Sequence, residues 1–439
     1  MKSSFWPENR ETLKKLAENH SEDTFEVFFS LPGTFLIDGN DAEKIALSEK
    51  SNTEKIIFPK VKNLKYHILK STDAEKIAEE IESFSCQKAI AFSFWTTPLD
   101  WTCLEDAIIA EELEKRGIET YGHNIKSSLT FFDKAESRHF FEKNNFQCPK
   151  AVEVKHELFF KTGRDMTKNI YREAVLKEIS KLNYPVVIKD TTGLSSFGLD
   201  RADSFKEASA ILLSRKNRGD RLVEEYIQGE HFGCELYGKK GSWIFEEPLM
   251  FSLNRWGITS PKQSVKTGPV SNEKWKIEEL KKELCRMADL LDMKGVLQAD
   301  LIFNKEKGWY FTEINPRISG MTGTYAALEK KGIGQFVAEK LLFPEAKTEN
   351  KGKILNFKFP LLSESEREKM KSLPYVRLVN QIENLEARQD RETGYAEVVL
   401  WGKDFSELKE NLKKLSEEFP SKTENIFLEK AEKMFSLLS

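Results

Sequence analysis

The chain has 439 residues and a formal net charge of −3, with 32% charged and 39% hydrophobic residues. This length predicts about three domains, each large enough to bury its own core. The slightly acidic balance argues against a surface whose main task is to bind nucleic acid. No apolar run approaches the ~20 residues of a membrane span, and no signal-peptide pattern is present. The five cysteines are scattered without metal-ligand spacing, which predicts reduced thiols in a cytoplasmic protein.

Residues 1–125 alternate short apolar runs with amphipathic patterns. Three runs predict strands: FEVFFSL, EKIIFPK and KAIAFSFW. Two patterns predict helices: DAEKIAEEIESF and LEDAIIAEELEKRG. Such alternation is typical of α/β layers with a parallel sheet. No GxGxxG occurs, so the dinucleotide-binding fingerprint is absent.

A lysine ends a buried-type strand in the middle of the chain. YPVVIK ends in Lys189 and is followed by DTTGLSSFG, which is rich in small and hydroxyl residues. A lysine point charge beside backbone N–H groups and hydroxyls can hold phosphate oxygens. An ordinary surface turn is the alternative. The polar segment 155–182 before this strand predicts helix and indicates no chemistry.

A long irregular loop follows at residues 250–270. It is rich in Ser, Gly and Pro and carries Arg255, Lys262 and Lys266. Such a loop inside a compact domain is either functional or disordered. We expect it to act as a lid that excludes water from reactive phosphates, although the sequence does not indicate which cation points inward. Residues 273–293 then predict an amphipathic helix.

Residues 295–324 predict two strands joined by a polar turn. If Phe303 pairs with Tyr310, the antiparallel register places Asp300 opposite Glu313. We therefore expect these two carboxylates to lie on one side of a hairpin.

Asn315 shares a face with Glu313, because side chains alternate along a strand. Mg²⁺ prefers hard oxygen ligands and is held by one or two carboxylates plus substrate phosphates. Asp300, Glu313 and Asn315 thus predict a site for Mg²⁺, with Mn²⁺ as a possible substitute. Arg317, just beyond the strand, can brace a phosphoryl group through two parallel hydrogen bonds. A hairpin with a solvated acidic face is the alternative.

The run FTEINPR, with an acid thirteen residues upstream of its glutamate, resembles the metal-binding end of the ATP-grasp superfamily. These enzymes use ATP to join a carboxylate to an amine or other nucleophile through an acyl phosphate. Residues from about 120 to 345 resemble D-alanine–D-alanine ligases in several ordered motifs, and the flanks resemble them only loosely.

The resemblance implies a role for each matching residue. The residues that it places at the phosphates are Lys134, Lys189, Ser195, Ser196 and Gly198. Those that it places at adenosine are Glu224 for the amino group, Glu225 and Ile227 for the base, and Glu230 for the ribose. In SGMTGTYAALEKKG it implies that the Gly320 N–H faces a developing oxyanion.

Two features depart from D-alanine–D-alanine ligases. Those enzymes carry an arginine two residues before the metal aspartate, where this chain has Gln298. Here Arg317 follows the asparagine, as in biotin-carboxylase-like members. Residues 346–439 add three predicted strands and a helix, resembling the C-terminal extension of biotin-carboxylase-like members and amino-acid ligases. We therefore expect a substrate other than D-alanine, either another amino acid or a peptide-like carboxylate.

The sequence predicts an α/β protein of the ATP-grasp fold. The expected parts are an N-terminal open parallel-sheet domain (1–125), an ATP-grasp domain whose two lobes hold ATP (126–345) and a C-terminal α/β cap (346–439). The expected function is an ATP-dependent carboxylate–amine ligase that uses Mg²⁺ and small-molecule substrates. We expect no nucleic-acid or membrane partner, and a homodimer is possible.

Three alternatives stay open at this point. The protein could be an ATP-grasp kinase that phosphorylates a hydroxyl, or a nucleotide-binding module without catalysis, since fold does not fix function. It could also be another α/β binding protein in which the D…E-x-N set is coincidental.

Overall fold

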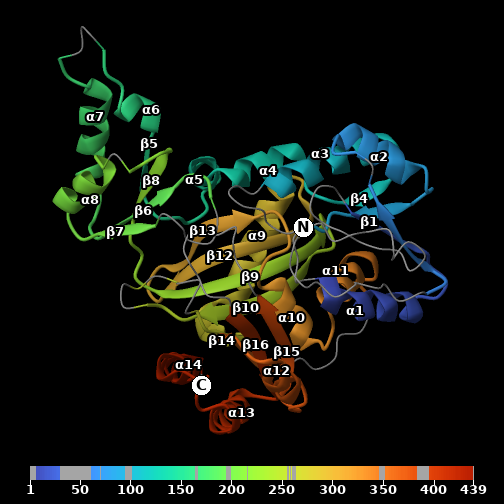
Figure 1. The fold of residues 1–439 in the computed structure, drawn as a ribbon. Helices are drawn as coiled ribbons and strands as arrows, with labels where there is room; N and C mark the ends of the chain where they lie inside the picture. The colour runs from blue at the N-terminus through green and yellow to red at the C-terminus, as the bar shows by residue number, and fades with distance from the viewer. Residues whose placement is uncertain are drawn as a thin grey trace.

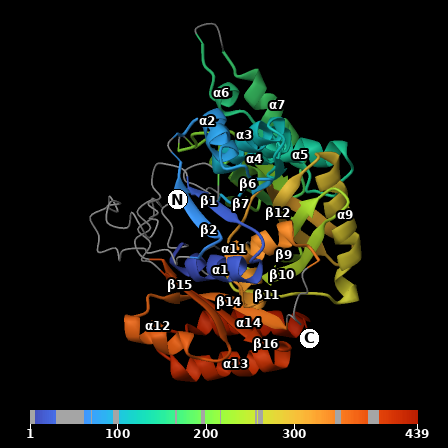
Figure 2. The ribbon, with the colours of Figure 1, turned by 90° about the vertical axis from the view of Figure 1, so that its right-hand side faces the viewer.

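The computed structural model describes residues 6–29, 61–69, 71–93, 101–163, 167–193, 199–214, 216–254, 257, 259, 264–345, 352–382 and 395–438. These residues form an N-terminal part, a small lobe and a large sheet with its helices. Figure 1 shows the small lobe, which carries α7 and α8, projecting away from the N-terminal helices α2 and α3. The C-terminal helix α13 lies at the opposite end of the molecule from α7 (Figure 2).

The N-terminal part contains parallel strands, as the sequence pattern predicts. Its elements are α1 (Trp6–Asn19), β1 (Phe25–Phe29), β2 (Leu64–Ile68), α2 (Ala74–Glu82), β3 (Lys88–Ile90), α3 (Trp101–Lys115) and β4 (Glu119–Tyr121). Strand β1 pairs with β2 and β3 pairs with β4, both in parallel. The strand predicted in EKIIFPK lies outside the described residues.

The small lobe is a four-stranded antiparallel sheet covered by helices. Its elements are β5 (Ala151–Val154), α6 (His156–Phe159), α7 (Ile170–Ile179), β6 (Val186–Asp190), β7 (Asp200–Ala202), α8 (Phe205–Leu212) and β8 (Arg221–Glu225). The strand order is β5-β8-β6-β7. Phe159 and Ile179 of the helices pack with Ile188 and Val223 of the strands in one buried cluster. The polar segment 155–182 therefore forms part of the lobe's core.

Eight antiparallel strands form the large sheet. They are β9 (Glu230–Lys239), β10 (Ile244–Phe251), β11 (Lys266–Gly268), β12 (Lys294–Asn304), β13 (Gly308–Asn315), β14 (Lys353–Pro360), β15 (Val376–Ile382) and β16 (Tyr395–Gly402). Their order is β13-β12-β9-β10-β11-β14-β16-β15. Because β11 pairs with β14, the predicted C-terminal strands continue the sheet that carries the hairpin. The boundary expected at 345/346 falls inside one sheet, and the three-domain division stays a prediction.

Both faces of this sheet are covered by helices. The helices are α4 (Ile125–Phe132), α5 (Lys134–Lys143), the 3₁₀ helix η1 (Glu273–Trp275), α9 (Ile277–Leu290), α10 (Thr322–Leu328), α11 (Ile333–Leu342), α12 (Glu364–Lys371), α13 (Phe405–Glu418) and α14 (Asn425–Leu438). Among the described helices, none combines the length and apolarity needed to cross a membrane.

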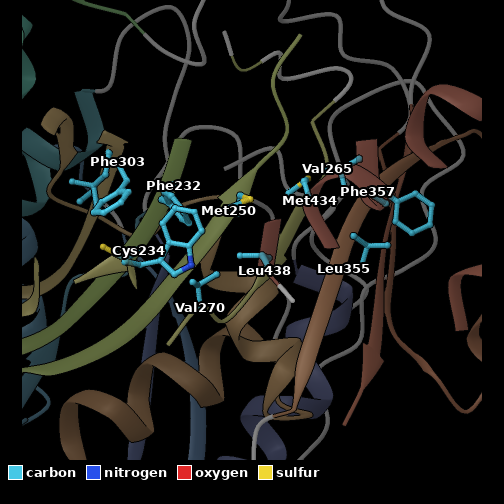
Figure 3. Packing of buried hydrophobic residues seen from close by; sticks show 14 of the residues in the cluster. Phe232, Cys234, Met250, Val265, Val270, Phe303, Leu355, Phe357, Met434 and Leu438 are labelled. Atoms are coloured by element: carbon cyan, nitrogen blue, oxygen red, sulfur yellow. The ribbon is translucent and has the colours of Figure 1, made fainter. Parts of the chain in front are cut away.

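The main hydrophobic core joins the C-terminal helices to the hairpin strands. Figure 3 shows Met434 and Leu438 of α14 among the sheet residues Phe232, Met250 and Phe357. Helix α9 adds its apolar stripe to the same cluster, which confirms the predicted amphipathic helix. Helices α10 and α11 pack on the opposite face. This opposite face also carries the polar residues described below.

We expect a chain that ends at residue 345 to lose its cooperative unfolding transition. Losing the residues after 345 would leave β11 as an open edge and expose the core face of the sheet. Thermal unfolding followed by circular dichroism, with the full chain as control, measures the effect. A cooperative melt of the shortened chain within about 5 °C of the full chain would show that the C-terminal segment is an independent cap.

Candidate active site

A β-bulge sets the geometry of the hairpin. Leu301 of β12 pairs with Phe311 of β13, but the adjacent Asp300 pairs with Glu313. Thr312 is therefore an extra residue on β13, and its hydroxyl donates a hydrogen bond to the Asp300 carbonyl at 2.7 Å. Bulges of this kind redirect side chains and occur often beside active sites.

The bulge corrects one prediction and confirms another. The predicted pairing of Phe303 with Tyr310 is wrong, because Phe303 pairs with Trp309. The extra residue shifts the register by one before the acidic positions. Asp300 nevertheless lies opposite Glu313 as predicted.

The same bulge decides which face the acidic residues occupy. Trp309, Phe311 and Ile314 all lie in the main core. Strict alternation from Phe311 would direct Glu313 into that core. The extra residue instead turns Glu313 and Asn315 to the opposite face, where Asp300 lies.

A chain of side-chain hydrogen bonds links the polar residues on this face. Gln298 Nε2 donates to Asp300 Oδ1 at 2.8 Å. Asn315 Nδ2 donates to Gln298 Oε1 at 2.7 Å, and Arg317 Nη2 donates to Asn315 Oδ1 at 3.1 Å. The amide of Gln298 thus fixes the aspartate and the asparagine relative to each other.

The electrostatics of the pair favour a bound cation. Burial, together with the negative charge of Glu313, raises the pKa of Asp300 to about 6. Gln298, Lys266 and Arg317 oppose this shift but do not cancel it. A divalent ion between the two carboxylates would relieve their repulsion.

The donor set fits magnesium held together with a phosphate-bearing substrate. In the described part of the chain, no group of three or more His, Cys, Asp or Glu side chains forms a complete metal cage. Asp300 and Glu313 supply two carboxylates, and Asn315 supplies an amide oxygen. Mg²⁺ is commonly bound by one or two carboxylates, with phosphate oxygens and waters as its other ligands. The residues present therefore fit Mg²⁺ or Mn²⁺.

Lys134 lies beside these carboxylates because of a helix cap. Asp133 ends α4 and caps α5, where its side chain accepts a hydrogen bond from Ala135 N at 2.7 Å. This cap places Lys134 at the first position of α5. Its Nζ lies 3.5 Å from Glu313 Oε1 and donates to the Gly193 carbonyl at 3.0 Å.

Lys189 belongs to a buried ionic cluster on the neighbouring strands. Its Nζ lies 2.7 Å from Oε2 of Glu224, whose other oxygen pairs with Arg138. Burial lowers the pKa of Lys189, against the opposing charges of Glu224 and Glu313. Burial alone would raise the pKa of Glu224, but Arg138 and Lys189 hold it below the ordinary value. Both predicted phosphate lysines therefore lie near Glu313.

The residues predicted for adenosine are not all directed to one place. The side chain of Glu224 is occupied by two cations. Glu225 instead accepts hydrogen bonds from Asn183 N and Nδ2, at 3.0 and 2.9 Å. Ile227 follows β8, and Glu230 begins β9. Their roles stay predictions.

Two loops were expected to contact phosphates. Ser195, Ser196 and Gly198 lie outside the described residues, as do Arg255 and Lys262.

Of the three cations expected on a lid, Lys266 is the one that the structure describes, and it lies on a strand of the large sheet. It begins β11, and its positive charge lowers the pKa of Asp300. Its Nζ also lies 5.6 Å from the centre of the Phe251 ring. The structure thus places this cation near the carboxylates, which the sequence could not indicate.

Arg317 and Gly320 lie on the turn between β13 and α10. Arg317 Nη1 donates to the Ile318 carbonyl at 3.1 Å, and the residue lines a small cavity together with Asp106 and His123. Gly320 is exposed, and the space where a Cβ would lie is open. The N-terminal part therefore borders this end of the site. The catalytic roles of Arg317 and Gly320 stay predictions.

Sequence reasoning missed three polar residues of this region, Arg138, His231 and Glu235, and it did not predict the hydrogen bonds of Gln298. Period-two alternation in EHFGCELYG, with Phe232, Cys234 and Leu236 in the core, could have located His231 and Glu235 on the other face. Burial lowers the pKa of His231 to about 4. No local signal identifies Arg138, because its carboxylate partner lies 86 residues away.

Comparisons with known proteins relate about half of this chain to one domain family and to one group of ligases. Residues 131–321 match the ATP-grasp domain family. The D-alanine–D-alanine ligase of Ruminiclostridium cellulolyticum is 26% identical over 219 residues, which cover 48% of this chain and 56% of that protein. The ligase of Francisella philomiragia is 23% identical over 224 residues, or 50% of this chain and 67% of that protein. The chain thus spans little more than half the length of the first relative.

Solved structures match nearly the whole chain. An L-amino acid ligase from Bacillus licheniformis has a TM-score of 0.63 at 15% identity, covering 95% of both chains. N5-carboxyaminoimidazole ribonucleotide synthetase from Thermus thermophilus has a TM-score of 0.58 at 14% identity, covering 94% of this chain and 96% of that one. These likenesses confirm the predicted α/β fold, including the C-terminal strands.

Asp300→Asn should stabilise the metal-free protein at pH 7. A carboxyl whose pKa is raised by folding destabilises the folded state above that pKa, and this effect disappears as the pH falls below its unfolded value of 3.8. We expect the free energy of unfolding to rise by on the order of 2 kcal/mol. Thermal denaturation from pH 4 to 8 measures this, with the exposed Glu306→Gln as control.

The same variant should lose the stabilisation that Mg²⁺ with ATP gives the parent protein. A metal-free Asp300→Asn protein that is less stable than the parent at pH 7 would contradict the repulsion between the two carboxylates.

Proposed function

Because residues 131–321 match the ATP-grasp domain family, we propose that this chain is an ATP-dependent carboxylate–amine ligase. The terminal phosphoryl group of ATP passes to a substrate carboxylate, which gives ADP and an acyl phosphate. An amine then attacks the acyl carbon, phosphate leaves, and the amine gives up a proton to complete the amide. One observation carries the proposal: Asp300, Glu313 and Lys134 meet on one polar face of an otherwise apolar hairpin.

Asp300, Glu313 and Asn315 would hold Mg²⁺, which offsets triphosphate charge when bound. Lys134 and Lys189 bring two positive charges towards the same place, as phosphate binding requires. Glu224 holds the Lys189 ammonium in position through an ion pair. No side-chain nucleophile is needed, since the acyl phosphate is already activated, and positioning supplies much of the rate.

The turn after β13 is proposed to act on the carboxylate that is being activated. Arg317 offers a planar guanidinium, which can brace two oxygens at once. The Gly320 N–H lies three residues further along the same exposed turn and can stabilise an oxyanion. Lys266 on β11 adds a positive charge that acts on Asp300, and we propose that the three donors together stabilise the charge that develops on the carboxylate.

The proposed substrates are an amino acid or peptide-like carboxylate and an amine, rather than two D-alanine molecules. Gln298 occupies the position of the arginine in D-alanine–D-alanine ligases, and its amide is engaged with Asp300 and Asn315. Because this amide is neutral, Gln298 cannot supply a positive charge to the intermediate. The likeness of the whole chain to an L-amino acid ligase supports the same choice.

A substrate panel tests the proposed function. Purified protein is incubated with ATP, Mg²⁺ and pairs of amino acids, dipeptides and hydroxy acids, and ADP release and products are followed by mass spectrometry. We expect ADP and an amide in equal amounts for at least one pair. A phosphorylated hydroxyl without ligation would identify a kinase instead. Robust synthesis of D-alanyl-D-alanine would contradict the proposed substrate class.

Arg317→Lys should lower kcat by about 100-fold although the charge is kept, because an ammonium cannot reproduce a two-pronged contact. The KM for ATP should change little. Arg286→Lys, on the surface of α9 and paired with Glu283, is the matched control. A kcat within threefold of the parent would give Arg317 a scaffolding role only.

A further inference from the structure

A fully buried carboxylate lies beneath the exposed turn of the site. Glu235 is in the middle of β9, between β10 and β12, and none of its side chain reaches solvent. Among the described residues, no basic side chain forms an ion pair with it. Burial raises the pKa of Glu235 to about 7, with a contribution from Glu246 and opposition from three hydroxyl donors. A buried acid without a cation is costly, so a simple packing role would be filled better by an apolar residue.

The three hydroxyl donors show where this carboxylate acts. Ser319 Oγ and Thr322 Oγ1 each donate to Glu235 Oε1 at 2.7 Å. The Tyr237 hydroxyl donates to Oε2. Ser319 lies on the turn between β13 and α10, Thr322 is the first residue of α10, and the third donor comes from the same strand as Glu235.

The two hydroxyls of the turn also accept hydrogen bonds from its backbone. Ser319 Oγ accepts from Met321 N, and Thr322 Oγ1 accepts from Ser319 N, both at 2.9 Å. The amides on either side of Gly320 are therefore held by side chains that are themselves held by Glu235. Within the described part of the chain, the Gly320 N–H has no acceptor, so it is available to a substrate.

Met321 adds a second anchor on the same strand. A Cβ at Gly233 would lie 2.4 Å from Met321 Sδ, so the Met321 side chain lies directly against the backbone of β9. Gly233 also pairs with Asp300. The turn is therefore fixed directly against the strand next to the metal carboxylate.

We propose that Glu235 is a positioning residue that holds the Ser319–Thr322 turn, and with it the Gly320 N–H, in the geometry needed for the acyl-transfer step. This inference rests on the proposed ligase function. Glu235 does not touch substrate. It acts through Ser319 and Thr322, and an acceptor oxygen at its position is the feature that matters.

Glu235→Leu removes the acceptor with little change in volume. We expect kcat to fall about 100-fold, with the KM for ATP within about twofold of the parent, because the turn is displaced and the nucleotide site is not. Glu235→Gln keeps an oxygen for the two hydroxyls and should retain most of the activity. Tyr237→Phe is the matched control, since it removes a hydrogen bond to the same carboxylate without touching the turn. Equal losses in the Leu and Gln variants, or a kcat of Glu235→Leu within threefold of the parent, would overturn the proposal.

Two substitutions of Thr322 test the proposal if Glu235→Leu does not fold. Thr322→Val removes one donor with its size kept, whereas Thr322→Ser keeps the donor. We expect the Val variant to lose kcat and the Ser variant to retain it. Equal kcat values for the two would contradict the proposal.

Hydrogen exchange separates a failure of this inference from a failure of the proposed function. Amides in residues 319–324 should exchange about tenfold faster in Glu235→Leu than in the parent, with those of β6 and β8 unchanged. This comparison needs no substrate, so it stands even if no ligation is found in the panel. Unchanged exchange at the turn, or faster exchange throughout the chain, would overturn the positioning role.

Discussion

The site depends on two carboxylates being held on one face of a buried hairpin. The extra residue Thr312 allows Phe311 and Ile314 to stay in the core while Glu313 turns the other way. Without that change of face, Glu313 would be a charge in an apolar cluster. With it, Glu313 faces Asp300, and its negative charge helps to raise the pKa of that carboxyl. A local departure from regular strand geometry thus brings two carboxylates together on one face of the sheet.

The positively charged residues of the site come from separate parts of the chain. Helix α5 carries Lys134 and Arg138, β6 carries Lys189, and β11 carries Lys266. Glu224 on β8 connects the first two elements by accepting from both Arg138 and Lys189. Because Lys134 also reaches Glu313, the small lobe and the large sheet meet through charged groups. A divalent cation there would relieve the repulsion between the two carboxylates, and the lysines would attract an anionic ligand.

Local patterns predicted much of this arrangement. Asp300 lies opposite Glu313 as predicted, but the register assumed at the turn was wrong by one residue and the bulge makes up the difference. The strands and helix of the C-terminal segment lie where their apolar runs are. The bulge could not be foreseen, because Thr312 is an ordinary strand residue and its insertion is decided by core packing on the other face. That packing also explains why the C-terminal strands extend the main sheet.

The sequence also could not predict which residues contact the site residues. The pairing of Glu224 with Arg138 and the support of the Gly320 turn by Glu235 join segments more than 80 residues apart. Nothing in the local pattern marks either contact. They arise only when α5, β8, β9 and the turn after β13 are brought together by the fold.

The proposed reaction requires ATP to activate a carboxylate on this face of the hairpin. The most direct measurement uses a substrate carboxylate labelled with oxygen-18 and follows the label by mass spectrometry during turnover with ATP and an amine. We expect one labelled oxygen to appear in the released phosphate, because the carboxylate oxygen bonds to phosphorus and leaves with it. Amide formation with unlabelled phosphate, or ADP formation with all label kept in the carboxylate, would contradict it.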